Sequence, residues 1–122
     1  RELSQQEQNA MKDDVFELVG VAGWSFNVAT DSFVITKQIS QIFGFPEGAE
    51  VTYDEAVELV HPNMQATIHK VKFAAIETGE PFETEVLMRT QSGEAWFRLL
   101  GEPKVADGKV ATIVGVAQPI KR

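Results

Sequence analysis

Apolar and polar residues alternate along the second half of the chain, which is the two-residue period of a strand with one buried face. Three such runs follow one another, over residues 82–90, 96–105 and 109–118. Asp107 and Gly108 separate the last two runs, and an Asp-Gly pair is the strongest short-range signal for a tight hairpin turn. The pattern therefore predicts three consecutive antiparallel strands.

Shorter elements precede these strands. Residues 24–28 and 33–36 alternate on either side of a turn and predict a hairpin. Apolar residues then recur at helical spacing in three segments, over residues 38–44, 53–60 and 62–78. Pro62 suits the first turn of the last helix, and Gly79 suits the position just after its end.

The N-terminal residues 1–19 favour a helix, because they contain neither Gly nor Pro. Their apolar residues form a narrow stripe, made by Leu3, Met11, Val15 and Leu18. A narrow stripe suits a seam between two helices, either in a dimer or against the helix's own domain, and the pattern leaves both open. We expect a flanking or dimerisation helix over residues 1–20 and one domain over residues 21–120.

Composition limits the class of protein. The 122 residues suffice for one domain, and 43% hydrophobic with 24% charged residues is ordinary for a globular protein. The net charge of −7 disfavours binding to nucleic acid or to an anionic membrane surface. Cysteine is absent, which excludes disulfides, thiolate metal sites and cysteine-linked chromophores. We expect a cytoplasmic piece of a longer protein that could itself be membrane-anchored, because the sequence starts at Arg1 and no stretch of about 20 apolar residues occurs.

Several short motifs accompany this order of elements. They are Gly23-Trp24-Ser25-Phe26, Ile42-Phe43-Gly44-Phe45-Pro46, His61-Pro62, Gly79-Glu80-Pro81-Phe82, Glu85, Gly93, Trp96, Gly101 and Val114-Gly115-Val116. In order and in motifs the chain resembles PAS domains of the sensory-box type that is common in bacterial sensor kinases and diguanylate cyclases. The resemblance implies an α+β fold with a five-stranded antiparallel sheet of order 2-1-5-4-3. It also implies short helices and one long helix on one face of the sheet, plus the N-terminal flanking helix.

Two departures from the family pattern stand out. Asn63 and Met64 follow His61-Pro62, where the family commonly has acidic residues. The family often closes with an Asp-Ile-Thr triplet that couples the last strand to an effector helix, and this chain has Ala117-Gln118-Pro119-Ile120 instead. The sequence therefore does not say how a signal would leave the domain.

The resemblance implies a small apolar pocket between the inner face of the sheet and the helices. The candidate pocket residues are Trp24, Phe26, Phe43, His69, Phe73, Val86, Met88, Trp96, Val114 and Val116. For most of them plain core packing is the better interpretation. His69 would offer a haem ligand in a haem-binding relative, and non-covalent flavin is a further option, but we expect neither cofactor.

Catalysis and metal binding find no support in the residues. The chain has no Gly-rich phosphate loop and no nucleophile elbow, and its two histidines with scattered carboxylates give no metal-ligand spacing. Glu83 and Glu85 share one face of a strand, and a solvated or partner-facing pair is the natural interpretation.

The sequence thus favours a non-enzymatic sensory or regulatory module of a bacterial signalling protein. It would bind a small ligand or a partner, form a homodimer, and relay a conformational change to an effector domain, a histidine kinase or a diguanylate cyclase, elsewhere in the parent. The alternative is a ligand-free PAS module for dimerisation or protein interaction. A small ligand-carrying enzyme with a similar curved sheet is a third hypothesis.

Overall fold

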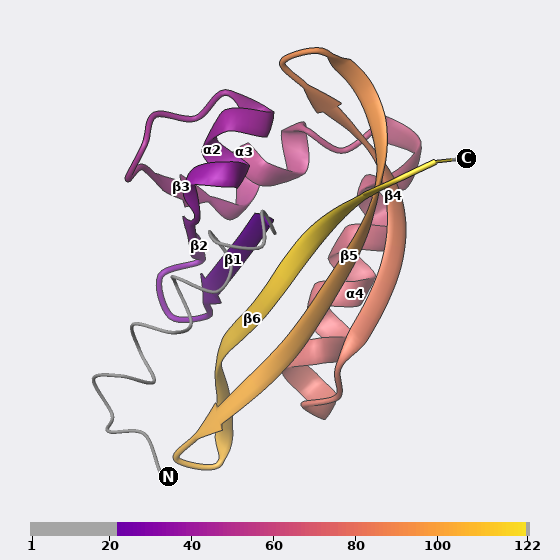
Figure 1. Ribbon diagram of the computed structural model, residues 1–122. Coiled ribbons are helices and arrows are strands. Elements are labelled where there is room, and N and C mark those ends of the chain that lie inside the picture. Colours follow the sequence, from indigo (N-terminus) through magenta and orange to yellow (C-terminus); the bar gives the residue numbers. More distant parts are fainter. Residues whose placement is uncertain (1–21, 122) are drawn as a thin grey trace, which may run out of the picture.

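The computed structural model describes residues 22–121 (Figure 1). The predicted N-terminal helix, with Leu3, Met11, Val15 and Leu18, lies outside the described residues and stays a prediction. The strands are β1 (Ala22–Asn27), β2 (Ser32–Ile35), β3 (Glu50–Thr52), β4 (Phe82–Thr90), β5 (Gly93–Ala106) and β6 (Lys109–Ile120). The helices are α2 (Lys37–Phe43), α3 (Tyr53–Glu58) and α4 (Gln65–Thr78), with a 3₁₀ turn at Pro62–Met64 before α4.

The strands form one antiparallel sheet in the order β3-β2-β1-β6-β5-β4. Without β3, this is the predicted order 2-1-5-4-3, and the α+β class is confirmed. The predicted number of strands was wrong, because β3 adds a sixth strand at the edge by pairing with β2. The sequence did not indicate β3, since three residues with Val51 between Glu50 and Thr52 are too few to establish a two-residue period.

Local turn chemistry sets the ends of several elements where the sequence predicted them. Helix α4 ends at Thr78, and Gly79 follows in the left-handed conformation with a φ of 70°. Asp107 and Gly108 both have positive φ values, which a primed two-residue hairpin turn between β5 and β6 requires. His61 caps the 3₁₀ turn, because its Nδ1 accepts a hydrogen bond from the backbone N–H of Asn63.

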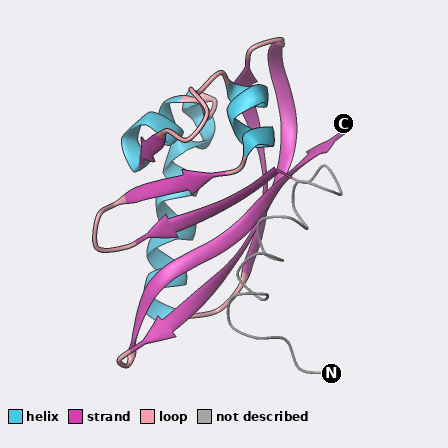
Figure 2. Cartoon of the chain, turned by 60° about the vertical axis from the view of Figure 1, so that its left-hand side comes forward, coloured by secondary structure: helices cyan, strands magenta, loops and turns pink. Residues whose placement is uncertain are grey.

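The helices gather on one side of the curved sheet (Figure 2). Two glycines, Gly101 on β5 and Gly115 on β6, lie opposite each other on the inner face. A Cβ atom at Gly115 would overlap the indole of Trp24 and the carbonyl oxygen of Leu100. The missing side chains therefore let aromatic rings lie directly against the middle of the sheet.

The core consists of two clusters of buried side chains rather than one. The first cluster contains Ala22, Ile39, Val60, Val86, Met88, Phe97 and Ala117. The second contains Phe26, Tyr53, Val57, Ala75 and Ile113. Trp24 and Ile68 are partly buried and pack against both clusters, so they mark the junction between them.

Candidate functional site

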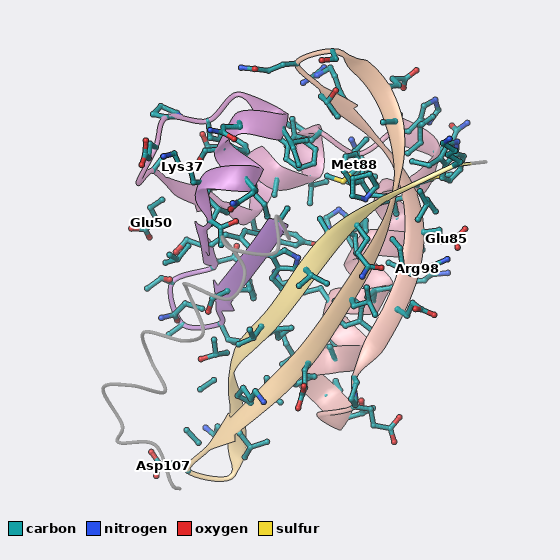
Figure 3. The ribbon with its side chains drawn as sticks, viewed as in Figure 1. Lys37, Glu50, Glu85, Met88, Arg98 and Asp107 are labelled. Atoms are coloured by element: carbon teal, nitrogen blue, oxygen red, sulfur yellow. The ribbon has the colours of Figure 1, made fainter. Side chains whose placement is uncertain are left out.

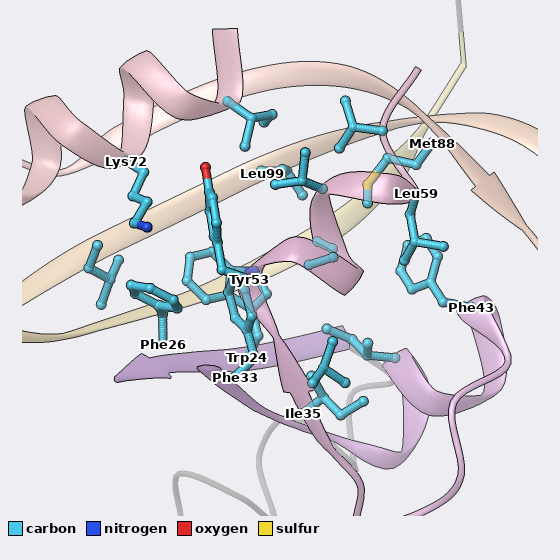
Figure 4. Close-up of a pocket in the computed structure, with 18 of the residues that line it drawn as sticks. Trp24, Phe26, Phe33, Ile35, Phe43, Tyr53, Leu59, Lys72, Met88 and Leu99 are labelled. Atoms are coloured by element: carbon cyan, nitrogen blue, oxygen red, sulfur yellow. The ribbon is translucent and has the colours of Figure 1, made fainter. Parts of the chain in front are cut away.

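A cavity of about 130 Å³ lies between the helices and the inner face of the sheet, where the two core clusters meet (Figure 4). Its walls include Ile39, Val60, Met88 and Ala117 of the first cluster, and Phe26, Tyr53, Val57 and Ile113 of the second. All six strands, β1 to β6, and helices α2, α3 and α4 of the described residues contribute wall residues. A molecule in this cavity would therefore contact both layers of the fold.

Aromatic side chains form much of the wall. Phe26 and Phe33 face each other across the β1–β2 hairpin with ring centroids 4.8 Å apart. Trp24 meets Phe33 edge-on at 5.7 Å and stacks on Phe82 at 6.3 Å. These ring contacts link β1, β2 and β4, and each pair adds to the energy of simple area burial.

Tyr53 is held in the wall by the start of helix α3. It is the first helical residue, and Thr52 before it forms a capping box with Glu55. The Thr52 hydroxyl accepts a hydrogen bond from the backbone N–H of Glu55 at 3.1 Å, and the Glu55 carboxylate accepts one from the backbone N–H of Thr52 at 2.9 Å. This capping fixes the helix start and so directs the phenol of Tyr53 into the fold.

The polar groups of the site gather at one end of the cavity. The Lys72 ammonium lies 2.8 Å from Asp31 Oδ1, 3.7 Å from the centre of the Tyr53 ring and 5.3 Å from that of Phe26. The Tyr53 hydroxyl lies 2.9 Å from His69 Nδ1. Figure 4 shows Lys72 and Phe26 at this end, with Phe43, Leu59 and Met88 at the other.

Burial perturbs the hydroxyl of Tyr53, whose side chain is only 6% exposed. Loss of solvation, together with the negative charges of Asp31 and Asp54, raises the pKa of Tyr53 to about 12. Tyr53 is therefore a neutral group at physiological pH, able to donate its hydroxyl hydrogen to His69.

The structure brings four of the ten predicted pocket residues to the cavity wall: Trp24, Phe26, Phe43 and Met88. Val86 is fully buried beside them in the first core cluster. His69 is exposed and contacts the site through Tyr53, by the hydrogen bond with its hydroxyl and by a tilted ring contact with centroids 5.6 Å apart. Phe73 is 67% exposed, because it lies on the side of α4 that faces away from the core. Contact with a ligand stays a prediction for all ten.

Trp96, Val114 and Val116 lie on the sheet face opposite the cavity, which corrects their assignment to the inner face. On β6 the buried residues are Ile113, Gly115 and Ala117, so Val114 and Val116 have the opposite parity. The larger side chains of this segment point outward because the inner positions leave room for the indole of Trp24. Trp96 faces outward because Phe97 is the buried neighbour on β5.

Sequence reasoning missed three wall residues that matter most for the chemistry: Phe33, Tyr53 and Lys72. Phe33 could have been found from the hairpin register, which pairs it with Phe26. Tyr53 was visible only as the first residue of a helix. Lys72 carried no signal, because a lysine on a helix is ordinarily a solvated charge.

The opposite sheet face combines ion pairs with apolar side chains. Arg98 on β5 lies 3.2 Å from Glu85 and 3.8 Å from Glu83, both on β4, so the three side chains form a cross-strand ion cluster. Figure 3 shows Arg98 and Glu85 beside each other. The partly buried apolar residues of this face are Leu87, Trp96, Leu100, Val114, Val116 and Ile120. We refer to these six residues as the outer apolar face.

Within residues 22–121 no three His, Asp or Glu side chains come together as a set of metal ligands. The helices of the same residues are too short or too polar to cross a bilayer.

Comparison with known proteins gives a family match. The family described as PAS fold matches residues 33–117. No curated protein matches the sequence.

Solved structures share the fold at low sequence identity. The N-terminal domain of a diguanylate cyclase with PAS/PAC sensor from Marinobacter aquaeolei is 22% identical, with a TM-score of 0.72, and the match covers 81% of this chain and 94% of that chain. A sensory box histidine kinase/response regulator from Burkholderia thailandensis is 20% identical, with a TM-score of 0.71 over 90% of this chain and 84% of that chain. The PAS domain of a Colwellia psychrerythraea protein is 16% identical, with a TM-score of 0.74 over 96% of this chain and 98% of that chain.

Proposed function

This chain belongs to the PAS fold family, and on that premise we propose that it is a sensory module that holds a small ligand in the cavity. Ligand binding would bias the packing of the helices against the sheet and so signal to an effector domain elsewhere in the parent protein. The similar structures named above come from a diguanylate cyclase with a PAS/PAC sensor and from a sensory box histidine kinase. The proposal is that this chain is a cytoplasmic domain of a signalling protein of one of these two kinds.

The observation that carries this proposal is the position of the cavity at the junction of the two core clusters. Its wall includes Trp24 of β1, Tyr53 of α3 and Lys72 of α4, so a ligand there would contact both the sheet and the helices. A ligand shifts a conformational equilibrium only if it binds one packing better than the other. A site that spans the interface between layers changes shape when the layers shift, so its affinity can differ between the two packings, whereas a surface site on one helix keeps its shape.

The proposal includes no catalytic step and no haem. His69 does not line the cavity, and its Nδ1 is engaged by the Tyr53 hydroxyl. The volume of about 130 Å³ is well below the roughly 300–1,000 Å³ of sites for drug-sized ligands and cofactors. Flavin would meet the same limit of space.

Native mass spectrometry of the purified chain, compared with its denatured mass, tests the proposal. Extra mass that is lost on denaturation would identify a bound ligand and its size. The same ligand, added back, should raise the unfolding temperature, because it binds only the folded state. A chain that carries no extra mass and responds to no member of a metabolite library would contradict the ligand-sensing function.

The outer apolar face supports a second function, that of a dimerisation module. A group of six partly buried apolar side chains on the surface of a sheet is typical of a contact surface. Val116→Glu should then shift the chain toward the monomer in sedimentation equilibrium, whereas Gln118→Glu, an exposed position two residues further along β6, should not. Equal molecular weights for both variants, each checked for folding by circular dichroism, would argue against an interface at this face.

A further inference from the structure

We propose that the cavity binds a small, neutral, apolar molecule of about the size of one aromatic ring. The inference rests on the proposed ligand-sensing function and names the ligand class for the same site. Three properties of the cavity carry it: the volume, the chemistry of the wall, and the fact that the polar groups at its edge already have partners.

The volume sets the size class of the ligand. A cavity of about 130 Å³ is close to the roughly 150 Å³ apolar cavity that is known to take up benzene or xenon in another protein. A molecule with two fused rings and substituents would need the walls to move. One ring with a short substituent fits without such a change.

The wall sets the polarity of the ligand. Apart from Trp24, Tyr53 and Lys72, every side chain that lines the cavity is a hydrocarbon or the thioether of Met88. A charged group placed among these side chains would lose its hydration and gain no compensating partner, which costs several kcal/mol or more. A neutral apolar ligand instead gains by leaving water, at about 25 cal/mol for each Å² that it buries.

The one charge on the wall is already compensated. Lys72 lies 2.8 Å from Asp31 and sits over the ring of Tyr53, and its side chain remains 27% exposed. An anionic ligand at Lys72 would therefore have to displace the Asp31 carboxylate or lie beside its negative charge. The Tyr53 hydroxyl likewise has a partner in His69. The polar groups at this end of the cavity therefore need neither a hydrogen bond nor a countercharge from the ligand.

Toluene and benzoate make a matched pair of probes, because they share the ring and differ in the charge of the substituent. Each is titrated into the full chain, and binding is followed by the unfolding temperature and by methyl NMR shifts of Met88 and Ile68, which faces the same cavity. We expect toluene to bind saturably and benzoate to bind at least about tenfold more weakly, owing to the cost of burying its carboxylate.

Two sets of variants locate the site. Ala56→Leu places extra methyl groups into the cavity and should abolish toluene binding, whereas Ala74→Leu, the same change at an exposed helix position, should leave it unchanged. Lys72→Met keeps the length of the side chain and removes the charge. In this variant benzoate should bind no more weakly, relative to toluene, than it does in the native chain, because Lys72 is already paired with Asp31.

Several results would overturn the inference. Benzoate binding that equals or exceeds that of toluene, and that is lost in Lys72→Met, would assign the site to anions. Toluene binding that survives in Ala56→Leu would place the probe elsewhere. If neither probe binds but native mass spectrometry finds another ligand, the ligand class is wrong while the sensory function stands; if no ligand is found at all, both fail.

Discussion

Phe82 places its ring against Gly101, the residue directly opposite it on the neighbouring strand β5. A Cβ atom at Gly101 would overlap the Phe82 ring, whose atoms are the three nearest to that position. The ring in turn stacks on Trp24 and forms part of the cavity wall. A backbone position without a side chain thus decides where one wall of the candidate site stands.

Gly101→Ala should lower the free energy of unfolding by about 1–3 kcal/mol, because the new methyl group forces the Phe82 ring off the sheet. Gly101 does not have a positive φ, so no backbone strain contributes. In a Phe82→Leu background the same change should cost at least about 0.5 kcal/mol less, since the smaller side chain can move aside. Urea unfolding of the native chain, the two single variants and the double variant measures this coupling, and equal costs in the two backgrounds would contradict the role of Phe82.

Tyr53 should ionise with a midpoint near pH 12 in the folded chain and near pH 10 in urea, as seen in tyrosinate absorbance. It is the single tyrosine of the sequence, so the titration has no other source. Because the pKa is raised in the folded state, the stabilisation is complete below about pH 10 and is lost as pH rises through about 12. Tyr53→Phe should flatten this part of the stability profile. A folded chain that titrates near pH 10 would show that the hydroxyl is not desolvated.

Thr52→Ala should destabilise the chain by about 1 kcal/mol, because it removes the side-chain half of the capping box that begins α3. Thr67→Ala, at an exposed position inside α4, is the matched control and should be neutral or slightly stabilising. Thermal unfolding compares the two variants. Equal effects would mean that the cap does not hold the start of α3.

The capping box also predicts a pH dependence. Hydrogen bonds from the backbone N–H and then the side chain of Thr52 lower the pKa of Glu55. A lowered pKa gives stability above the usual pKa of a glutamate, and this stability is lost as pH falls through the lower, folded value. Glu55→Gln should therefore reduce the loss of stability in acid, while a pH profile identical to that of the native chain would exclude the effect.

Val86→Ala should cost about 2 kcal/mol, because Val86 is 0% exposed and its loss leaves a cavity in the first core cluster. Val105→Ala, the same change at a strand position that is 63% exposed, should stay within about 0.5 kcal/mol of the native chain. Denaturant unfolding measures both. Similar losses would mean that Val86 is not part of a tightly packed core.

Much of the fold could be predicted because its signals are local. Asp107 and Gly108 specify their turn by backbone preference, and Gly79 ends α4 in the same way. The alternation of residues 82–90 gave β4 with its bounds and its buried face. Strand β3 was missed because a strand of three residues is defined by its partner β2 rather than by its own pattern.

The candidate site was predicted less well, because it depends on which face of its strand each side chain occupies. Val114 and Val116 are the larger side chains of their segment, yet they face away from the cavity. The inner positions are Gly115 and Ala117, whose small size has a reason only when Trp24 is in place above them. Size and hydrophobicity along one strand do not carry that information.

The sequence by itself determined the positions of most strands, helices and turns, since short-range preferences and periods act within a few residues. Its resemblance to PAS domains implied the class of fold and the order of the strands in the sheet. Only the tertiary structure decided which residues meet at the cavity. Asp31 and Lys72 are 41 positions apart, and their ion pair exists because the β1–β2 turn and helix α4 are held side by side by the packing of Trp24, Phe26 and Tyr53. Such a contact depends on how the whole core packs, and the sequence of one short segment does not contain that information.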